Sequence, residues 1–403
     1  MTEAVIVAAV RSPIGRAQKG SLVSMRPDDL AAAVVKVAIA RVPALDPKEI
    51  EDVLLGCGQP AGEAGYNLAR VVALLAGVPH AGGATINRYC ASSLQAIRSA
   101  AHAIKSNEGD VFVAAGVETV SRFSQGKSDG MPNTKNPHFA DAEARSAERS
   151  QGAKGVWAPP SGLPDIYLSM GQTAENVAEL ENVGREEMDR FAARSQHNAV
   201  AAQQGGRFDR ELAPITLADG TVVSRDDGPR AGTTVEKLAE LKPVFRPDGR
   251  VTAGNACPLN DGAAALIIMS DTRAKALSIT PLARIVSTAV SAIDPEIMGL
   301  GPIEATRRAL SRAKLTMNDV DLVEINEAFA AQVIPCARAL EIPLEKLNVH
   351  GGAIALGHPF GMTGARIAAT LIHALHARNG RIGVETMCVG GGQGMAMVLE
   401  RLS

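Results

Sequence analysis

The chain has 403 residues, of which 46% are hydrophobic and 21% charged, and this composition excludes a protein that is disordered throughout. Lysine and arginine number 41 against 43 acidic residues, so no overall field attracts nucleic acid or anionic membrane. Aromatic residues are only 3%, too few for the stacking platforms that hold single-stranded bases. We therefore expect a globular chain of two or three domains without nucleic-acid or membrane partners.

The cysteines indicate a reducing compartment. Their number is odd, their spacing is wide and no CxxC occurs, which argues against a disulfide framework and against a zinc site. The apolar stretch near the N-terminus, 4–10, is short and lacks a basic region before it, so it is typical of a buried strand rather than a signal peptide. We expect a cytoplasmic protein without a metal.

The first 120 residues alternate apolar runs with helical patterns. This alternation predicts an α/β layered fold around a central sheet, with a mixed α+β domain as the alternative. The predicted strands and helices are, in chain order, strand 5–9, helix 30–40, strand 53–55, helix 94–104 and strand 111–115.

The next part of the chain has a different character. Residues 121–170 are rich in Ser, Gly, Pro, Asn and Lys without a sustained period, which is typical of a covering loop or a disordered segment. Helical spacing resumes from Thr173, and one predicted helix face carries Met188, Phe191, Ala192, Ser195 and Ala199. We interpret 121–250 as a loop domain inserted into the first half.

The last third repeats the layout of the first. Residues 45–55 align with 315–325 at an offset of 270 residues, Ile97 then aligns with Ile367, and strand 111–115 with 382–386 after a slip of one residue. Amphipathic segments could match by chance, but the order of elements is the same in all three matches, which favours a duplicated α/β unit. The predicted organisation is an N-terminal half 1–120, the insertion 121–250, a return to the first half at 251–275, and a C-terminal half 276–403.

Two cysteines occupy positions that suit chemistry. Cys90 directly precedes a predicted helix, where the dipole and free N–H groups would favour a thiolate. A buried, inert cysteine is the alternative interpretation. Cys388 ends the last strand before three glycines, whose bare backbone admits a ligand or simply forms a tight turn.

A histidine and an asparagine are further candidates. His358 lies in a Gly/Pro-rich loop before a predicted helix 365–375, and its ordinary pKa suits a general base. Asn326 follows the predicted strand 320–325, the usual place of site residues in α/β sheets, although capping the next helix would also explain it. His373 and His376 share a helix face but lack a third ligand, so we expect no metal site there.

Taken together these segments resemble the thiolases, the acyl-CoA:acetyl-CoA C-acyltransferases. The resemblance rests on five motifs in family order: NRYCASSLQA at 87–96, TAGNACPLNDGAAA at 252–265, INEAFA at 325–330, NVHGGAIALGHPFGMTGAR at 348–366 and MCVGGGQG at 387–394. It implies a duplicated five-layered αβαβα fold with an inserted loop domain, and an enzyme that works on coenzyme A as a substrate with no tightly bound cofactor. The family also implies a homodimer or homotetramer.

The resemblance assigns roles at matching positions. It implies that Cys90 is the nucleophile that takes the acyl group, His358 its base and Cys388 the acid/base for the acetyl α-proton. One oxyanion hole would use His358 with a water held by Asn326, and the other the N–H groups of Cys90 and Gly390. A thiolate attack and an enolate each develop negative charge, so two sets of donors suit a Claisen reaction.

Other positions matter for coenzyme A. The resemblance implies binding residues at Arg230, Ala253, Gly254 and Cys257, with Cys257-Pro258 where many thiolases have Ser-Gly. Ser93 replaces a common glycine in the nucleophile motif. Ser169-Met170 stands where short-chain biosynthetic thiolases have His-Met, which weakens an acetoacetyl-specific role.

The expected activity is therefore a degradative thiolase that works by a ping-pong route through an acyl group on Cys90. The alternatives are a biosynthetic thiolase that forms acetoacetyl-CoA, a ketoacyl synthase-like condensing enzyme and a non-catalytic scaffold. The second cysteine, Cys388, argues against a ketoacyl synthase, and the intact set of four side chains argues against a scaffold.

Overall fold

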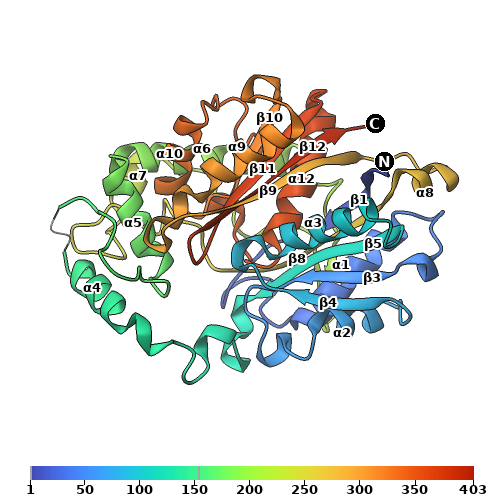
Figure 1. The fold of residues 1–403 in the computed structure, drawn as a ribbon, viewed down its shortest axis with the longest axis horizontal. Coiled ribbons are helices and arrows are strands. Elements are labelled where there is room, and N and C mark those ends of the chain that lie inside the picture. Colours follow the sequence, from blue (N-terminus) through green and yellow to red (C-terminus); the bar gives the residue numbers. More distant parts are fainter. Residues whose placement is uncertain (1, 153–154) are drawn as a thin grey trace.

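The structure is a computed structural model that describes residues 2–152 and 155–403 (Figure 1). All five elements predicted in the first 120 residues are confirmed, with ends that extend by up to four residues. The elements of this region are β1 (Ala4–Arg11), β2 (Gly15–Arg16), α1 (Pro27–Ala40), β3 (Asp52–Gly56), α2 (Leu68–Leu75), β4 (Gly82–Ile86), α3 (Ser92–Lys105) and β5 (Val111–Thr119).

The segment from 121 to 250 contains more helix than its sequence predicts. The helix α4 (Ala140–Ser150) lies in the part interpreted as an aperiodic loop, and only Ala142 of this helix is buried. Because α4 has almost no apolar stripe, hydrophobic periodicity could not reveal it. The predicted face of α6, by contrast, is buried as expected. The other elements here are α5 (Met170–Leu180), α6 (Arg185–Gln204), β6 (Ile215–Thr216), β7 (Val222–Val223) and α7 (Val235–Ala239).

After residue 250 the chain forms the remaining elements of the sheet and the helices that cover it. The strand β8 (Asn260–Ser270) pairs with both β1 and β5. The remaining elements are α8 (Asp271–Ala276), β9 (Ala283–Ala292), α9 (Gly301–Ala313), β10 (Leu322–Ile325), α10 (Ala330–Ala339), α11 (Ala353–Leu356), α12 (Thr363–Arg378), β11 (Ile382–Val389) and β12 (Gln393–Arg401).

The strands form one mixed sheet whose two halves pair in the same order. The order is β10-β11-β12-β9-β1-β8-β5-β3-β4, with β2 beside β8. The pairs β3–β5 and β10–β11 are parallel, whereas β5–β8 and β11–β12 are antiparallel. The halves meet where Val5 and Ile6 of β1 pair with Arg284 and Ala283 of β9.

The helices α3 and α12 pack against each other between the strands of the two halves. Their apolar side chains, Leu94 and Ile97 from α3 and Ile367 and Leu371 from α12, are completely buried in a shared core. A second core lies under α1 and α2, and a third joins α5, α6, α9 and α10 to the C-terminal strands. The starts of the two central helices therefore come close to the strand ends of both halves.

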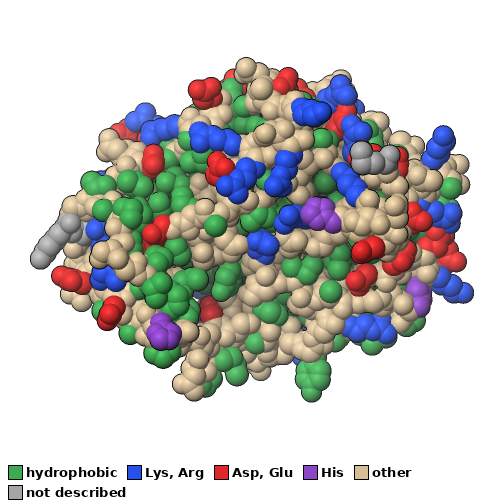
Figure 2. All heavy atoms as spheres, in the orientation of Figure 1, with side chains coloured by type: hydrophobic (Ala, Val, Ile, Leu, Met, Phe, Trp, Pro, Cys, Tyr) green, Lys and Arg blue, Asp and Glu red, His purple; other side chains and the backbone are tan. Residues whose placement is uncertain are grey.

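The surface carries charges of both signs. In Figure 2 basic and acidic side chains are interspersed, and hydrophobic side chains gather on the left, where Figure 1 places α5 and α7. Across 2–152 and 155–403, no helix is long and apolar enough to cross a membrane.

Candidate active site

Cys90 lies in a single 3₁₀ turn, Tyr89–Ala91, that leads directly into α3. The preceding Tyr89 has φ 43°, in the left-handed region that non-glycine residues rarely occupy. Two hydrogen bonds hold this turn: the Tyr89 N–H donates to Asn87 Oδ1 at 2.8 Å, and Ser92 Oγ donates to the Tyr89 carbonyl at 2.6 Å. The predicted place of Cys90 at the start of a helix is confirmed.

The predicted ease of ionisation of Cys90 is wrong for this structure. Burial raises the pKa of the Cys90 thiol to about 11, although the N–H groups of Gly390 and of Cys90 itself lower it. Only 9% of the residue is exposed, so the loss of solvation raises the pKa of the thiol more than the helix N-terminus lowers it. Both N–H groups of the second predicted oxyanion hole nevertheless lie at the Cys90 sulfur.

The hydrogen bonds of His358 define its tautomer. Thr363 Oγ1 donates to the Pro359 carbonyl at 2.7 Å, so it accepts from His358 Nδ1–H at 2.6 Å. The lone pair of Nε2 is then the acceptor, and the amide Nδ2–H of Asn326 donates to it at 3.3 Å. Burial, followed by the charge of Arg366, lowers the pKa of His358 to about 3, so the imidazole is neutral near pH 7.

Asn326 does not cap a helix. The next helix, α10, begins at Ala330 with Phe329 as its N-cap residue, so the capping alternative is wrong. The side chain of Asn326 instead faces His358. The backbone N–H of Asn326 donates to the Thr386 carbonyl of β11 at 3.0 Å. The buried Oδ1 atom has no hydrogen-bond partner among the described residues. A polar atom left in this way is a natural position for a bound water.

Cys388 is buried near the end of β11, and the glycines after it form a turn. Gly391 and Gly392 have φ values of 77° and 78°, in the left-handed region, which explains why glycine is required at these two of the three positions. The pKa of the Cys388 thiol lies well above its ordinary value because of burial and because Cys90, Cys336 and Cys257 lie near enough to oppose a thiolate. The fold thus brings Cys388, Cys90 and Cys257 together from segments far apart in the chain.

A cavity of about 410 Å³ opens at Cys90. Phe360 lines this cavity, and its ring packs edge-on against His358 with centroids 5.2 Å apart. Much of the remaining wall comes from 129–135 and 166–170, in the segment predicted to cover the site. The complete lining is Gly58, Gln59, Tyr89, Cys90, Asp129, Thr134, Lys135, Ile166, Tyr167, Leu168, Ser169, Met170, Phe360, Gly390 and Gly391.

The residues predicted for coenzyme A lie outside this lining. Arg230 and Ala253 are exposed, while Gly254 and Cys257 are half-buried. Burial raises the pKa of the Cys257 thiol most, and a charge on Cys90 raises it further. The second effect shows that Cys257 lies near Cys90. Burial and then the nearby Arg16 lower the pKa of Arg230, which places two arginines in one neighbourhood.

Glu118 is a site residue that sequence reasoning missed. Its carboxylate, at the end of β5, accepts the N–H groups of Gly58, Gln59 and Gly361 at 2.8, 3.2 and 2.9 Å. It therefore ties the loop after β3 to the loop that carries His358. Burial raises the pKa of Glu118 to about 7. A polar residue at the end of a predicted strand could have singled out Glu118 as a candidate. The sequence could not show which backbone N–H groups its carboxylate accepts.

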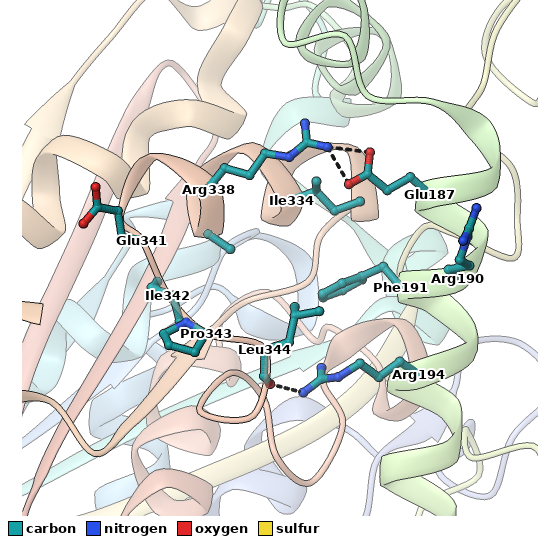
Figure 3. Close-up of a pocket in the computed structure, with 11 residues that line it drawn as sticks. Glu187, Arg190, Phe191, Arg194, Ile334, Arg338, Glu341, Ile342, Pro343 and Leu344 are labelled. Atoms are coloured by element: carbon teal, nitrogen blue, oxygen red, sulfur yellow. Dashed lines mark hydrogen bonds and ion pairs between the residues drawn. The ribbon is translucent and has the colours of Figure 1, made fainter. Parts of the chain in front are cut away.

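A second cavity lies elsewhere. It measures about 840 Å³ and lies between α6 and α10. Figure 3 shows it lined by side chains such as Phe191 and Ile334, with Arg338 paired to Glu187. No cysteine or histidine lines it, so it offers no group for acyl transfer. Within the described ranges, no group of three or more His, Cys, Asp or Glu residues could hold a metal ion.

The chain is similar to known proteins over its whole length. Residues 4–272 match the thiolase N-terminal domain and residues 279–401 the thiolase C-terminal domain. The chain is 47% identical over 414 residues to the 3-oxoadipyl-CoA/3-oxo-5,6-dehydrosuberyl-CoA thiolase of Escherichia coli K12, with all of both chains covered. It is 43% identical over 411 residues to a 3-ketoacyl-CoA thiolase of Aeromonas salmonicida, also with complete coverage.

A solved structure extends the match to the fold. The crystal structure of the Bacillus anthracis acetyl-CoA acetyltransferase superposes with a TM-score of 0.86 at 41% identity, covering 100% of this chain and 99% of that one. The α/β fold with its mixed central sheet is thus the thiolase fold. With both domain families matched and the relatives covered from end to end, the chain belongs to the thiolase family of acyltransferases.

Proposed function

We propose that this protein is a degradative 3-ketoacyl-CoA thiolase, which converts a 3-ketoacyl-CoA and coenzyme A into acetyl-CoA and a shortened acyl-CoA. The observation that carries the proposal is that Cys90 and Gly390 line one cavity, with Cys388 buried close to Cys90 and His358 packed against Phe360 of the cavity wall. Such a site holds a nucleophile, a neutral base and a second thiol that can carry a proton.

The first half-reaction transfers the acyl group to Cys90. His358 Nε2 takes the proton of the Cys90 thiol, and the sulfur attacks the 3-keto carbon. The bond between C2 and C3 then breaks, its electron pair forms the acetyl-CoA enolate, and Cys388 returns a proton to C2. Fixed N–H donors at the developing oxyanion contribute roughly 3 kcal/mol each.

The second half-reaction releases the acyl group. The Cys388 thiolate left by the first half takes the proton of the coenzyme A thiol, and the sulfur attacks the acyl-Cys90 carbonyl. The C–S bond to Cys90 then breaks, and the leaving Cys90 thiolate recovers its proton from His358. The N–H groups of Cys90 and Gly390 would stabilise this tetrahedral intermediate. His358 with a water on Asn326 would stabilise the enolate of the other half, and the unpartnered Oδ1 of Asn326 supports such a water.

Coenzyme A is a substrate in this scheme, and no tightly bound cofactor is proposed. Arg230, with its neighbour Arg16, suits the phosphates at the nucleotide end. Ala253, Gly254 and Cys257 would line the path of the pantetheine arm toward Cys90. Cys257 would then place a thiol where the family motif has a serine hydroxyl.

The proposed substrates include 3-ketoacyl-CoA esters of dicarboxylic acids, of which 3-oxoadipyl-CoA is one. The Escherichia coli relative named for such substrates supports this class. The similarity to the Bacillus anthracis acetyl-CoA acetyltransferase, at 41% identity, supports a second candidate function, a short-chain thiolase that acts on acetoacetyl-CoA. A cavity of about 410 Å³ and Ser169 in its wall favour the longer chains.

Assembly and location complete the proposal. The strand β4 is an edge of the sheet, and the apolar side chains of Tyr66, Leu74 and Leu75 nearby are 99%, 53% and 42% exposed. Such a patch supports a homodimer, alone or within a homotetramer. The five free cysteines support a cytoplasmic location, and the matching strand order of the two halves supports a duplicated five-layered fold with 121–250 inserted.

A panel of substrates tests the function. Thiolysis by the purified protein is measured with acetoacetyl-CoA, 3-oxohexanoyl-CoA, 3-oxodecanoyl-CoA and 3-oxoadipyl-CoA, each with coenzyme A. We expect kcat/KM to be at least tenfold higher for 3-oxoadipyl-CoA than for acetoacetyl-CoA. A preference for acetoacetyl-CoA would favour the second candidate, and no thiolysis of any of the four would contradict both.

A further inference from the structure

The wall of the catalytic cavity contains two charged side chains, Asp129 and Lys135, among the described residues that line it. Asp129 pairs with Lys127 at 3.4 Å, and Lys127 does not belong to the lining. The negative charge of Asp129 is thus paired with a lysine outside the cavity wall. Lys135 is the one cation that the lining itself supplies.

Neighbouring side chains hold Lys135 at this wall. Its Nζ lies 5.6 Å from the centre of the Tyr167 ring and pairs with Glu143 of α4. Tyr167 is itself fixed, because its hydroxyl accepts the Asn136 N–H at 2.9 Å and its ring packs edge-on against Phe139 at 5.4 Å. The position of the ammonium group is therefore defined before any ligand arrives.

The chemistry of Lys135 suits an anion that enters the cavity. Its hydrogen bond to Glu143 raises its pKa, so the side chain is charged near neutral pH. An ammonium group has three N–H donors, and Glu143, which does not line this cavity, accounts for one of them. The side chain is still 59% exposed, so a carboxylate can reach the remaining donors.

The same wall also offers apolar surface to a bound acyl chain. Ile166, Leu168, Met170 and Phe360 belong to the same lining as Cys90 and Lys135. An acyl chain with methylene groups and a terminal carboxylate matches this combination of apolar side chains and one cation. An ordinary fatty acyl chain would have no partner for the ammonium group.

We propose that Lys135 determines substrate specificity by binding the terminal carboxylate of a dicarboxylic acyl chain whose other end is bonded to Cys90. This inference rests on the proposed function and adds the residue that recognises the substrate class. An ionic hydrogen bond of this kind changes affinity about 10- to 100-fold.

The test compares two substrates with the same six-carbon backbone, 3-oxoadipyl-CoA and 3-oxohexanoyl-CoA, of which only the first has a terminal carboxylate. For Lys135→Met we expect the ratio of their kcat/KM values to fall about 10- to 100-fold, mainly because the dicarboxylic substrate binds less tightly and its KM increases. Lys135→Glu should lower the ratio further, and Lys135→Arg should retain most of it. Lys105→Met is the matched control, because Lys105 also pairs with a glutamate, Glu3, but lies outside the cavity.

The outcomes separate the inference from the proposed function. If the wild type prefers 3-oxoadipyl-CoA and Lys135→Met keeps the same ratio, the role of Lys135 is wrong and the substrate class stands. If both substrates lose activity equally, Lys135 is structural and the inference fails. If the wild type cleaves 3-oxohexanoyl-CoA but not 3-oxoadipyl-CoA, the dicarboxylic class and Lys135 fail together, while the thiolase activity stands.

Discussion

At the scale of single residues, the reactivity of Cys90 depends on two opposing effects on one sulfur. The N–H groups of Gly390 and Cys90 favour the thiolate, and burial in the wall of the cavity opposes it more strongly. Cys90 and His358 are then both neutral in the free enzyme. In the proposed mechanism, the thiolate would form when a substrate carbonyl arrives and its developing oxyanion accepts hydrogen bonds from these N–H groups.

This balance predicts how alkylation of Cys90 depends on pH. With a pKa of about 11, the thiolate fraction increases nearly tenfold per pH unit between pH 7 and 9. We expect the rate of inactivation by iodoacetamide to increase by the same factor, with the label on Cys90 in peptide maps and with protection by acyl-CoA. A rate that levels off below pH 8 would show that the N–H groups prevail over burial.

The two thiols at the site should fail in different ways. Cys388→Ala should still take an acetyl group from acetyl-CoA onto Cys90, because this step needs only the nucleophile, its base and one oxyanion hole. It should not exchange the methyl protons of acetyl-CoA with deuterated water. Cys90→Ala should form no adduct, and Cys336→Ala is the control for a buried thiol away from the cavity. Intact-protein mass spectrometry and NMR of recovered acetyl-CoA give the two readings, and exchange at the wild-type rate in Cys388→Ala would exclude its role.

At the scale of elements, the site depends on loops that leave strand ends and enter helices. Glu118 at the end of β5 joins two such loops through three backbone N–H groups. Replacing its carboxylate leaves buried donors without partners, and each donor contributes about 1–3 kcal/mol. The loop that carries His358 would then lose one of its anchors.

The raised pKa of Glu118 gives a pH-dependent signature. A carboxyl whose pKa is raised on folding, here from 4.5 to about 7, contributes stability below pH 4.5 that is lost as the pH rises through 7. We expect the free energy of unfolding of the wild type, relative to Glu118→Gln, to fall by about 3 kcal/mol between pH 4.5 and 7.5. Urea titrations at several pH values measure this difference. A constant difference would mean that the three N–H donors keep the pKa near its ordinary value.

At the scale of the whole molecule, the proposed dimer uses the exposed patch beside β4. The double variant Leu74→Lys/Tyr66→Ser should sediment as a smaller species than the wild type, because it loses the apolar contact between the two subunits of the proposed dimer. Both side chains are exposed in the single chain, so its fold should survive. Leu344→Lys is the control, since Leu344 is equally exposed, at 53%, but lies at the cavity between α6 and α10. An unchanged sedimentation coefficient in the double variant would place the interface elsewhere.

The local order of strands and helices was largely predictable from the sequence. The apolar periods of α1, α3 and β5 identified their type, because each buries one face or both against a core. The helix α4 was missed for the same physical reason, since it buries almost nothing. Family motifs then predicted which side chains carry chemistry, although position in the sequence could not show whether Asn326 caps a helix or faces His358.

Only the tertiary structure decided the properties that depend on surroundings. Burial reversed the expected acidity of Cys90, because desolvation is set by every segment packed around the thiol rather than by its helix alone. The contact of Glu118 with two loops, and the shared cavity of Lys135 and Cys90, join residues that are far apart in the chain. Hydrophobic spacing acts over a few residues and therefore determines local elements, whereas solvation and charge act through space and are determined by the fold.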